Sequence, residues 1–176
     1  MNSDRVVSIS AMIVAVGTLF VIIYQTHLTR KAQQASVLPY LQIGYSRSEG
    51  YSYINLVNHG IGPALIEDIR VIKEGSSYPG DPVAFFSQLN EDLDSNEGLY
   101  IDRVFQGMLI PAGASKAMIG VRRSSEEAMR LERVFNVTGI GEEEGEPEKA
   151  IIVITYASVY GKRWVIHSNE IVPKPS

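Results

Sequence analysis

The sequence ALIEDIRVI, residues Ala64–Ile72, is the clearest indicator of the fold class. Its apolar residues Ile66, Ile69 and Val71 are interleaved with three charged residues. Because successive side chains of a β-strand point to opposite faces of the sheet, this alternation predicts a strand with one face exposed. The run Ala150–Ile154 is apolar throughout, which indicates a central strand covered on both faces.

The chain beyond Pro39 repeats this pattern, with short β-rich runs separated by clusters of Gly, Pro, Asn and Ser. Strands are predicted at Tyr40–Tyr45, Tyr53–Val57, Ala64–Ile72, Tyr100–Gln106, Lys116–Val121, Ala150–Ala157 and Lys162–His167. Two short inserted helices are predicted, one beginning at Asp81-Pro82 and the other at Ser125. About seven strands in roughly 140 residues are typical of an immunoglobulin-like β-sandwich. We therefore expect a mainly β fold of that kind.

A different pattern precedes Pro39. Val6–Tyr24 reads VVSISAMIVAVGTLFVIIY, 19 residues without a charge. As a helix rising about 1.5 Å per residue it spans roughly 28 Å, the thickness of the hydrocarbon core of a bilayer. A signal peptide would have a shorter apolar region followed at once by a small-residue cleavage site, whereas Gln25–Leu28 follows here. The predicted organisation is a polar leader at 1–5, a transmembrane helix at 6–24, a helical stalk at 25–38 and a β-sandwich domain at 39–176.

Charge indicates the direction of this span. Residues 1–36 carry Arg5, Arg30 and Lys31 against Asp4, a net charge of +2. Because the whole chain has a net charge of −4, residues 37–176 carry −6. Because basic residues beside a span favour the cytoplasmic side, we predict a single-pass inner-membrane protein with its C-terminal domain in the cytoplasm. A periplasmic domain with the opposite topology is the alternative.

Composition excludes several classes of function. An acidic domain is expected to be a poor ligand for nucleic acid or for an anionic bilayer surface. The chain has no cysteine, which excludes a disulfide scaffold, a Cys-ligated zinc module and a cysteine nucleophile. Partners are therefore expected to be the lipid bilayer, through residues 6–24, and a protein.

Small side chains recur at helical spacing within the span, at Ser8, Ala11, Ala15 and Thr18. Such a face lets a second helix approach closely, so it is a candidate surface for a homo-oligomer. The alternative is that small residues are common in any anchor.

The run Asn58–Ala64, NHGIGPA, lies between two predicted strands. Gly60 and Gly62 are expected to allow positive φ, and Pro63 to fix the chain before the next strand. A phosphate-binding loop would open a helix instead, and a strand pattern follows here. We predict a structural turn built by Asn58, Gly60, Gly62 and Pro63.

No constellation of catalytic residues is evident. The three histidines, His27, His59 and His167, lie in no spacing typical of a metal site. There is no G-x-S-x-G sequence to present a nucleophilic serine. No catalytic residue, cofactor or metal ligand is predicted, and the protein is not expected to be an enzyme. A hydrolase whose triad or metal site is assembled only in the fold remains the alternative.

The segment Thr155–Trp164 reads as two strands joined by a turn containing Gly161. Tyr160 and Arg163 lie near its tip and are of the residue types that favour protein interfaces. They are the predicted partner-binding residues, whereas the single Trp164 is expected in the core.

Several of these motifs together resemble a loose group of uncharacterised bacterial single-span, membrane-anchored proteins. The resemblance rests on the N-terminal span, Pro39-Tyr40, the N-x-G-x-G-P-A turn at Asn58–Ala64, the run Leu109–Gly113 and the hairpin Tyr156–Trp164. It implies a bacterial, membrane-tethered β-sandwich and no particular reaction. The expected function is that of a membrane-anchored module that binds or senses a protein partner. A periplasmic accessory domain of an envelope complex is a further alternative.

Overall fold

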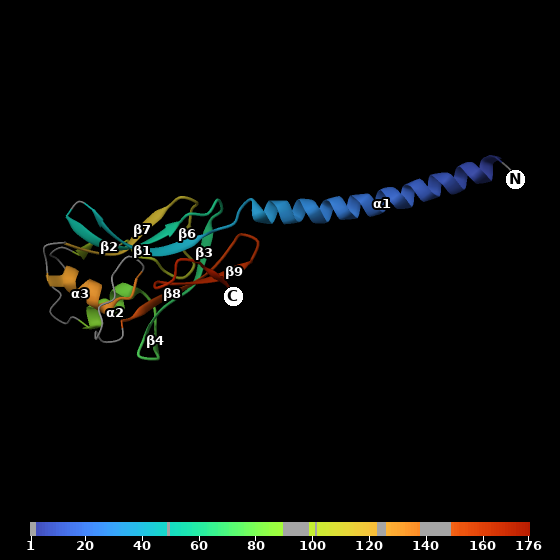
Figure 1. Cartoon of the computed structure of the whole chain (residues 1–176). Helices are drawn as coiled ribbons and strands as arrows, with labels where there is room; N and C mark the ends of the chain where they lie inside the picture. Colours follow the sequence, from blue (N-terminus) through green and yellow to red (C-terminus); the bar gives the residue numbers. More distant parts are fainter. Residues whose placement is uncertain (1–2, 49, 90–98, 101, 123–125, 138–148) are drawn as a thin grey trace. The chain divides into compact units, whose positions relative to one another are not determined.

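A computed structural model describes residues 3–48, 50–89, 99–100, 102–122, 126–137 and 149–176. The chain divides into two units, Met1–Ser36 and Val37–Ser176. Each is described by itself (Figure 1).

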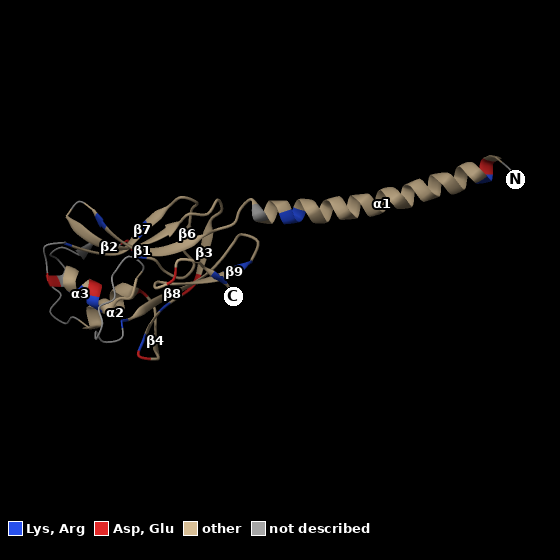
Figure 2. Ribbon diagram, in the orientation of Figure 1, with Lys and Arg blue, Asp and Glu red and all other residues tan. Residues whose placement is uncertain are grey.

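The first unit is the helix α1, Ser3–Ala35. It continues past Tyr24 without a break because good helix formers follow and the next proline is Pro39. Its charged residues lie only near its two ends, and residues 6–29 contain no Asp, Glu, Lys or Arg (Figure 2). By length and composition α1 can cross a membrane, and it is the one helix of this kind in the described residues. Where leader, span and stalk divide along it stays a prediction.

The second unit is mainly β and contains two sheets. The order of strands in the first sheet is β1 (Leu41–Ser48), β2 (Tyr51–Asn58), β7 (Ser115–Arg122) and β5 (Leu99–Tyr100). In the second sheet the order is β10 (Lys174–Pro175), β9 (Arg163–His167), β8 (Ile151–Ala157), β3 (Ala64–Lys73) and β4 (Ser76–Pro79), and β6 (Leu109–Ile110) also pairs with β3. The pairings between these named strands are antiparallel. The predicted mainly β fold with an N-terminal helix is confirmed.

Burial follows the sequence pattern in the two strands that indicated the fold. Along β3, Ile66, Ile69 and Val71 are buried, while the charged residues between them are partly exposed. β8 lies between β3 and β9 and buries three consecutive residues, Ile152–Ile154. A half-covered strand and a strand covered on both faces are therefore read correctly from the amino-acid pattern.

The predicted strand Tyr100–Gln106 is wrong for residues 102–106, which the structure describes without a strand. Leu99–Tyr100 forms the short strand β5. Gly107 has a φ of 87°, and the Met108 amide donates to the Phe105 carbonyl, so the chain turns where the prediction continued a strand. Three short strands were not predicted: β4, β6 and β10.

The two inserted helices are α2, Pro82–Leu89, and α3, Glu126–Val134. Asp81 caps α2 as predicted, because its Oδ1 accepts a hydrogen bond of 2.9 Å from the Val83 amide. The predicted start of the second helix, Ser125, lies outside the described residues. Both helices bury one face against the sheets.

The core of the domain is formed by side chains from both sheets and both helices. Tyr156 is its largest fully buried side chain. Trp164 is partly buried rather than central, and its ring stacks on Tyr156 with the centroids 5.8 Å apart. Phe85 and Phe86 of α2 pack against Phe135 beyond α3, which joins the two helices.

Candidate functional site

The predicted turn at Asn58–Pro63 is organised by one side-chain amide. Asn58 is fully buried. Its Oδ1 accepts hydrogen bonds from the amides of Tyr40, at 3.2 Å, and Gly60, at 3.0 Å. Its Nδ2 lies within hydrogen-bond distance of the carbonyls of Gly62, Ile110 and Pro111, at 2.9–3.1 Å. Asn58 therefore joins three separate segments of backbone through one buried side chain.

The two glycines of the turn serve a different purpose from the one predicted. Neither Gly60 nor Gly62 has a positive φ, so the prediction of left-handed backbone is wrong. A Cβ on Gly62 would lie 1.9 Å from the Val37 carbonyl oxygen, and one on Gly60 would lie 2.4 Å from that of Leu38. Glycine is required here because another stretch of backbone passes too close for any side chain.

That other stretch is Val37–Tyr40, the first residues of the domain. The His59 amide donates to the Tyr40 carbonyl at 2.8 Å, and the amides of Ile61 and Gly62 donate to the Leu38 carbonyl at 3.1 and 3.3 Å. The turn thus holds the beginning of the domain against the end of β2 through backbone hydrogen bonds. Its contacts in the described residues stabilise the fold.

The hairpin between β8 and β9 carries the predicted partner-binding residues. Gly161 has a φ of 75°, and its amide donates to the Ser158 carbonyl, which closes a tight turn. Tyr160, within this turn, is 49% exposed. The Nε of Arg163 lies 2.8 Å from Oε2 of Glu67 on β3, and its side chain is mostly exposed. The structure therefore holds a tyrosine ring and an oriented guanidinium on the surface of one hairpin.

Tyr156, at the base of this hairpin, is excluded from solvent. Burial raises the pKa of its phenol to about 12. The oxygen accepts a hydrogen bond of 3.3 Å from the Leu41 amide at the start of β1. This phenol fixes the first sheet against the second and is not available to a ligand.

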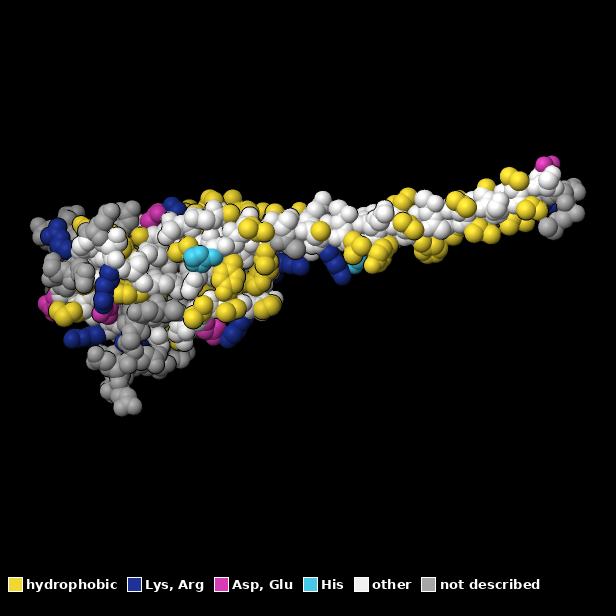
Figure 3. Space-filling model, turned by 45° about the horizontal axis from the view of Figure 1, so that its top comes forward, with side chains coloured by type: hydrophobic (Ala, Val, Ile, Leu, Met, Phe, Trp, Pro, Cys, Tyr) yellow, Lys and Arg dark blue, Asp and Glu magenta, His cyan; other side chains and the backbone are white. Residues whose placement is uncertain are grey.

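A second surface was not predicted from the sequence. Four aliphatic side chains are exposed on the segment Val37–Tyr40 or on segments hydrogen-bonded to it, and we call them the apolar end: Leu38, Ile61, Ile171 and Val172. The Ile61 amide donates to the Leu38 carbonyl, and the Tyr40 hydroxyl donates to the Ile171 carbonyl at 3.2 Å. Figure 3 shows hydrophobic side chains gathered at this end of the domain. The sequence pattern does not predict this surface, because its residues lie outside the strands.

The three histidines lie in three different elements of the chain. His59 is exposed in the turn, and Nδ1 of His167 lies 3.9 Å from Oε1 of Glu170. His27 lies on α1, in the other unit. Within the described ranges, no group of three or more His, Asp or Glu side chains could hold a metal ion.

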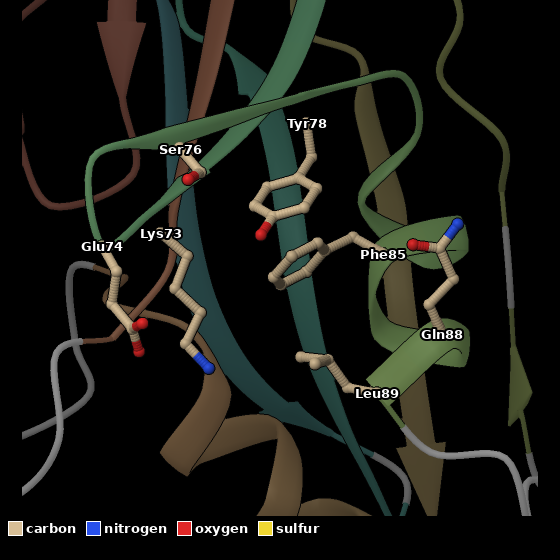
Figure 4. Close-up of a pocket in the computed structure, with 7 residues that line it drawn as sticks. All are labelled: Lys73, Glu74, Ser76, Tyr78, Phe85, Gln88 and Leu89. Atoms are coloured by element: carbon tan, nitrogen blue, oxygen red, sulfur yellow. The ribbon is translucent and has the colours of Figure 1, made fainter.

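A cavity of about 220 Å³ lies between the β3–β4 hairpin and α2 (Figure 4). The rings of Tyr78 and Phe85 pack on one side of it, with centroids 5.1 Å apart. Lys73 and Glu74 lie on the other side. The polar groups of the lining are one amine, one carboxylate and one phenol, together with the Ser76 hydroxyl and the Gln88 side-chain amide.

A polar cluster joins β1 to α3. The Tyr45 hydroxyl and Nη2 of Arg47 both donate to Oε1 of Glu132, the latter at 2.7 Å. The guanidinium also lies 5.3 Å from the centre of the Tyr45 ring. Burial alone would raise the pKa of Glu132, but the hydrogen bonds from Tyr45 and Arg47 outweigh it and the pKa is lowered. The cluster stabilises the position of α3.

The polar atoms of the small-residue face of α1 are satisfied within the helix. The Ser8 hydroxyl donates to the Asp4 carbonyl and the Thr18 hydroxyl to the Val14 carbonyl, both at 2.8 Å. Ala11 and Ala15 complete the face and are exposed. Self-association through these residues stays a prediction.

Comparison with known families found no model that matches the chain. Comparison with curated proteins and with solved structures found no similar protein either. The function must therefore be inferred from the surfaces and contacts of the chain itself.

Proposed function

We propose that this protein is a single-pass membrane protein whose domain binds a protein partner without catalysing a reaction. The observation that carries the proposal is the β8–β9 hairpin, which presents the exposed Tyr160 beside the Arg163–Glu67 ion pair. The domain is an immunoglobulin-like β-sandwich in the cytoplasm of a bacterial cell, and α1 is its anchor in the inner membrane.

The sandwich is supported by the shared core. Strands of the first sheet, through Leu41 and Ile54, and strands of the second, through Ile66 and Ile154, contribute to one cluster of buried side chains. Two antiparallel sheets that bury their facing side chains together are the basis of a sandwich.

The anchor and its direction are supported by the length of α1 and by its charges. The helix is long and apolar enough to span a bilayer. Arg30 and Lys31 follow the apolar stretch and favour the cytoplasmic side. The bacterial inner membrane is inferred from the sequence resemblance alone.

The choice of the hairpin as the binding surface follows from the chemistry of its residues. Tyrosine and arginine are enriched among the residues that dominate binding energy, because a partner can desolvate a large ring or a planar cation at little entropic cost. Glu67 holds the Arg163 guanidinium in place before binding, so less side-chain freedom is lost when a partner arrives.

The first test is photocrosslinking in cells. A photoreactive amino acid at Tyr160 in the full chain should give a discrete crosslinked species, and the additional change Arg163→Ala should reduce it. The matched control is the same amino acid at Met129 on α3, which is 54% exposed. Equal crosslinking at both positions would contradict the proposed binding surface.

The second test compares two double variants of the full chain. Tyr160→Ala with Arg163→Ala should weaken partner binding roughly 30-fold, since truncating two interface anchors commonly costs about 2 kcal/mol or more. His59→Ala with His167→Ala should leave binding and the cellular phenotype nearly unchanged. Both variants must first show an unchanged unfolding curve. If the folded histidine variant loses function while the hairpin variant keeps it, the hydrolase alternative replaces the proposal.

A further inference from the structure

We infer that the apolar end of the domain, formed by Leu38, Ile61, Ile171 and Val172, rests on the headgroup–acyl boundary of the bilayer that α1 crosses. The inference rests on the membrane anchor of the proposed function. It adds a second, lipid-binding surface that uses neither Tyr160 nor Arg163.

The first argument is the exposure of these side chains. They are 42–67% exposed, although all four are aliphatic. They come from three segments far apart in the sequence, and hydrogen bonds to Val37–Tyr40 hold two of those segments in place. The surface is therefore formed before it meets its ligand, and contact with lipid would remove apolar area from water.

The second argument is the length of the chain between the membrane and the surface. α1 has 33 residues and is thus about 50 Å long, while a bilayer with its headgroups is about 40–45 Å thick. Val37 follows the last residue of α1 by two positions. Ser3 at one headgroup surface would place Val37 within about 15 Å of the opposite one, because each added residue spans at most about 3.6 Å. The segment around which the apolar end is built is the part of the domain that the covalent chain keeps closest to lipid.

The third argument is charge. The domain as a whole is acidic, yet the chain carries Arg30 and Lys31 shortly before Leu38 and Lys174 shortly after Val172. Lys174 is paired with Glu170, at 2.6 Å. Arg30 and Lys31 lie on α1, where they favour anionic headgroups next to the stretch of chain that precedes Leu38, whereas Lys174 adds little because Glu170 offsets its charge.

Size favours lipid over a protein at this surface. Each partner in a stable protein complex contributes about 800 Å². Four aliphatic side chains, each smaller than the roughly 150 Å² that an aromatic residue buries, offer less than that. A tethered domain does not need a large surface, since the anchor supplies a high effective concentration of lipid.

The experiment uses spin labels on the full chain, which has no native cysteine to interfere. Ile61→Cys and Val172→Cys are labelled separately and reconstituted into vesicles of phosphatidylcholine and phosphatidylglycerol. The control is Met129→Cys on α3, which has similar exposure and lies at the opposite end of the domain from the β8–β9 hairpin (Figure 1). Collisions of each label with oxygen, which concentrates in lipid, and with a water-soluble nickel complex are measured.

Labels at 61 and 172 should collide with nickel at least about threefold less than the label at 129, and should keep their collisions with oxygen. Nickel collisions equal to those at 129 would overturn the inference. Labels shielded from both reagents, with spin–spin broadening that disappears on mixing with unlabelled chain, would identify a second copy as the occupant and also overturn it. Flotation of the vesicles separates the two proposals: a chain that does not float with lipid has no anchor, whereas a floating chain with water-exposed labels refutes only the lipid contact.

Discussion

At the scale of single residues, the Asn58 side chain makes hydrogen bonds to five backbone groups from three segments of the chain. Replacement by alanine would remove the partner of the partly buried Tyr40 amide and of the buried carbonyls of Gly62 and Ile110. Each unsatisfied buried group costs about 1–3 kcal/mol. We therefore expect Asn58→Ala to lower the free energy of unfolding by about 3 kcal/mol.

The measurement is denaturant unfolding of the full chain in detergent, followed by fluorescence of Trp164. This is the single tryptophan, and it reports on the domain through its stacking on Tyr156. The control is Asn55→Ala, which removes a half-buried contact with Ser46 and should cost less than about 1 kcal/mol. Equal losses for the two variants would show that the Asn58 network does not stabilise the turn.

Gly62 provides a second test at this scale, because its role is spatial. A methyl group there would collide with the Val37 carbonyl, so the two backbones must separate. We expect Gly62→Ala to destabilise the domain by about 2 kcal/mol, a typical cost of overpacking. Gly44→Ala is the matched control, since its Cβ would meet nothing within 4 Å and its φ is not positive. That variant should change the unfolding free energy by less than about 0.5 kcal/mol. Similar melting of both variants would contradict the close approach.

At the scale of elements, we expect the contact between β1 and α3 to stabilise the domain in a pH-dependent way through Glu132. Because its pKa is lowered in the folded state, the ionised carboxylate contributes stability above about pH 4.5, its ordinary value, and this contribution is lost as the pH falls through the lower folded value. Glu132→Gln keeps the shape and removes the charge. It should cost about 1 kcal/mol at pH 7, since hydrogen bonds to charged groups are worth about 1.5–3 kcal/mol and partial exposure reduces this.

Unfolding free energies of wild type and Glu132→Gln should therefore converge as the pH falls below about 4.5. Glu126→Gln is the control on the same helix. Its exposed pair with Arg130, four residues apart, should contribute less than about 0.5 kcal/mol at any pH. A constant gap between wild type and Glu132→Gln from pH 7 to pH 3 would show that the cluster does not titrate as the contacts imply.

The elements also show where sequence reasoning succeeds. The strands β3 and β8 were predicted because each carries a complete burial pattern over seven or more residues. The helix α2 was predicted from its cap, Asp81, and the proline that follows. The sequence pattern did not predict the tight turn that joins β3 to β4. Its two-residue loop, Glu74-Gly75, has positive φ at both positions, and glutamate is an unusual residue there.

The surfaces were harder to predict than the strands. Tyr160 and Arg163 were identified from residue type and place in a hairpin, and both lie on the surface. The requirement for Gly62 depends on Val37, 25 positions earlier, and no local pattern records such an approach. The apolar end has the same origin, since tertiary hydrogen bonds join Ile61 to Leu38 and Ile171 to Tyr40.

At the scale of the whole molecule, α1 is the proposed anchor and the β domain is the proposed binding unit. The two units differ in composition. Residues 6–29 of α1 carry no Asp, Glu, Lys or Arg, whereas residues 37–176 bury a hydrophobic core and carry the net negative charge. A membrane-spanning α1 is the first requirement of the proposed function, because both the anchor and the lipid contact depend on it.

Cysteine labelling in intact cells tests this requirement most directly, because the chain has no cysteine of its own. Ser3→Cys marks the beginning of α1 and Ser77→Cys marks the exposed β3–β4 hairpin of the domain. A membrane-impermeant maleimide should label position 3 in intact cells and position 77 only after the membrane is permeabilised. Labelling of both positions in intact cells, or of neither, would contradict a membrane-spanning helix, and labelling of position 77 alone would place the domain on the opposite side from the one proposed.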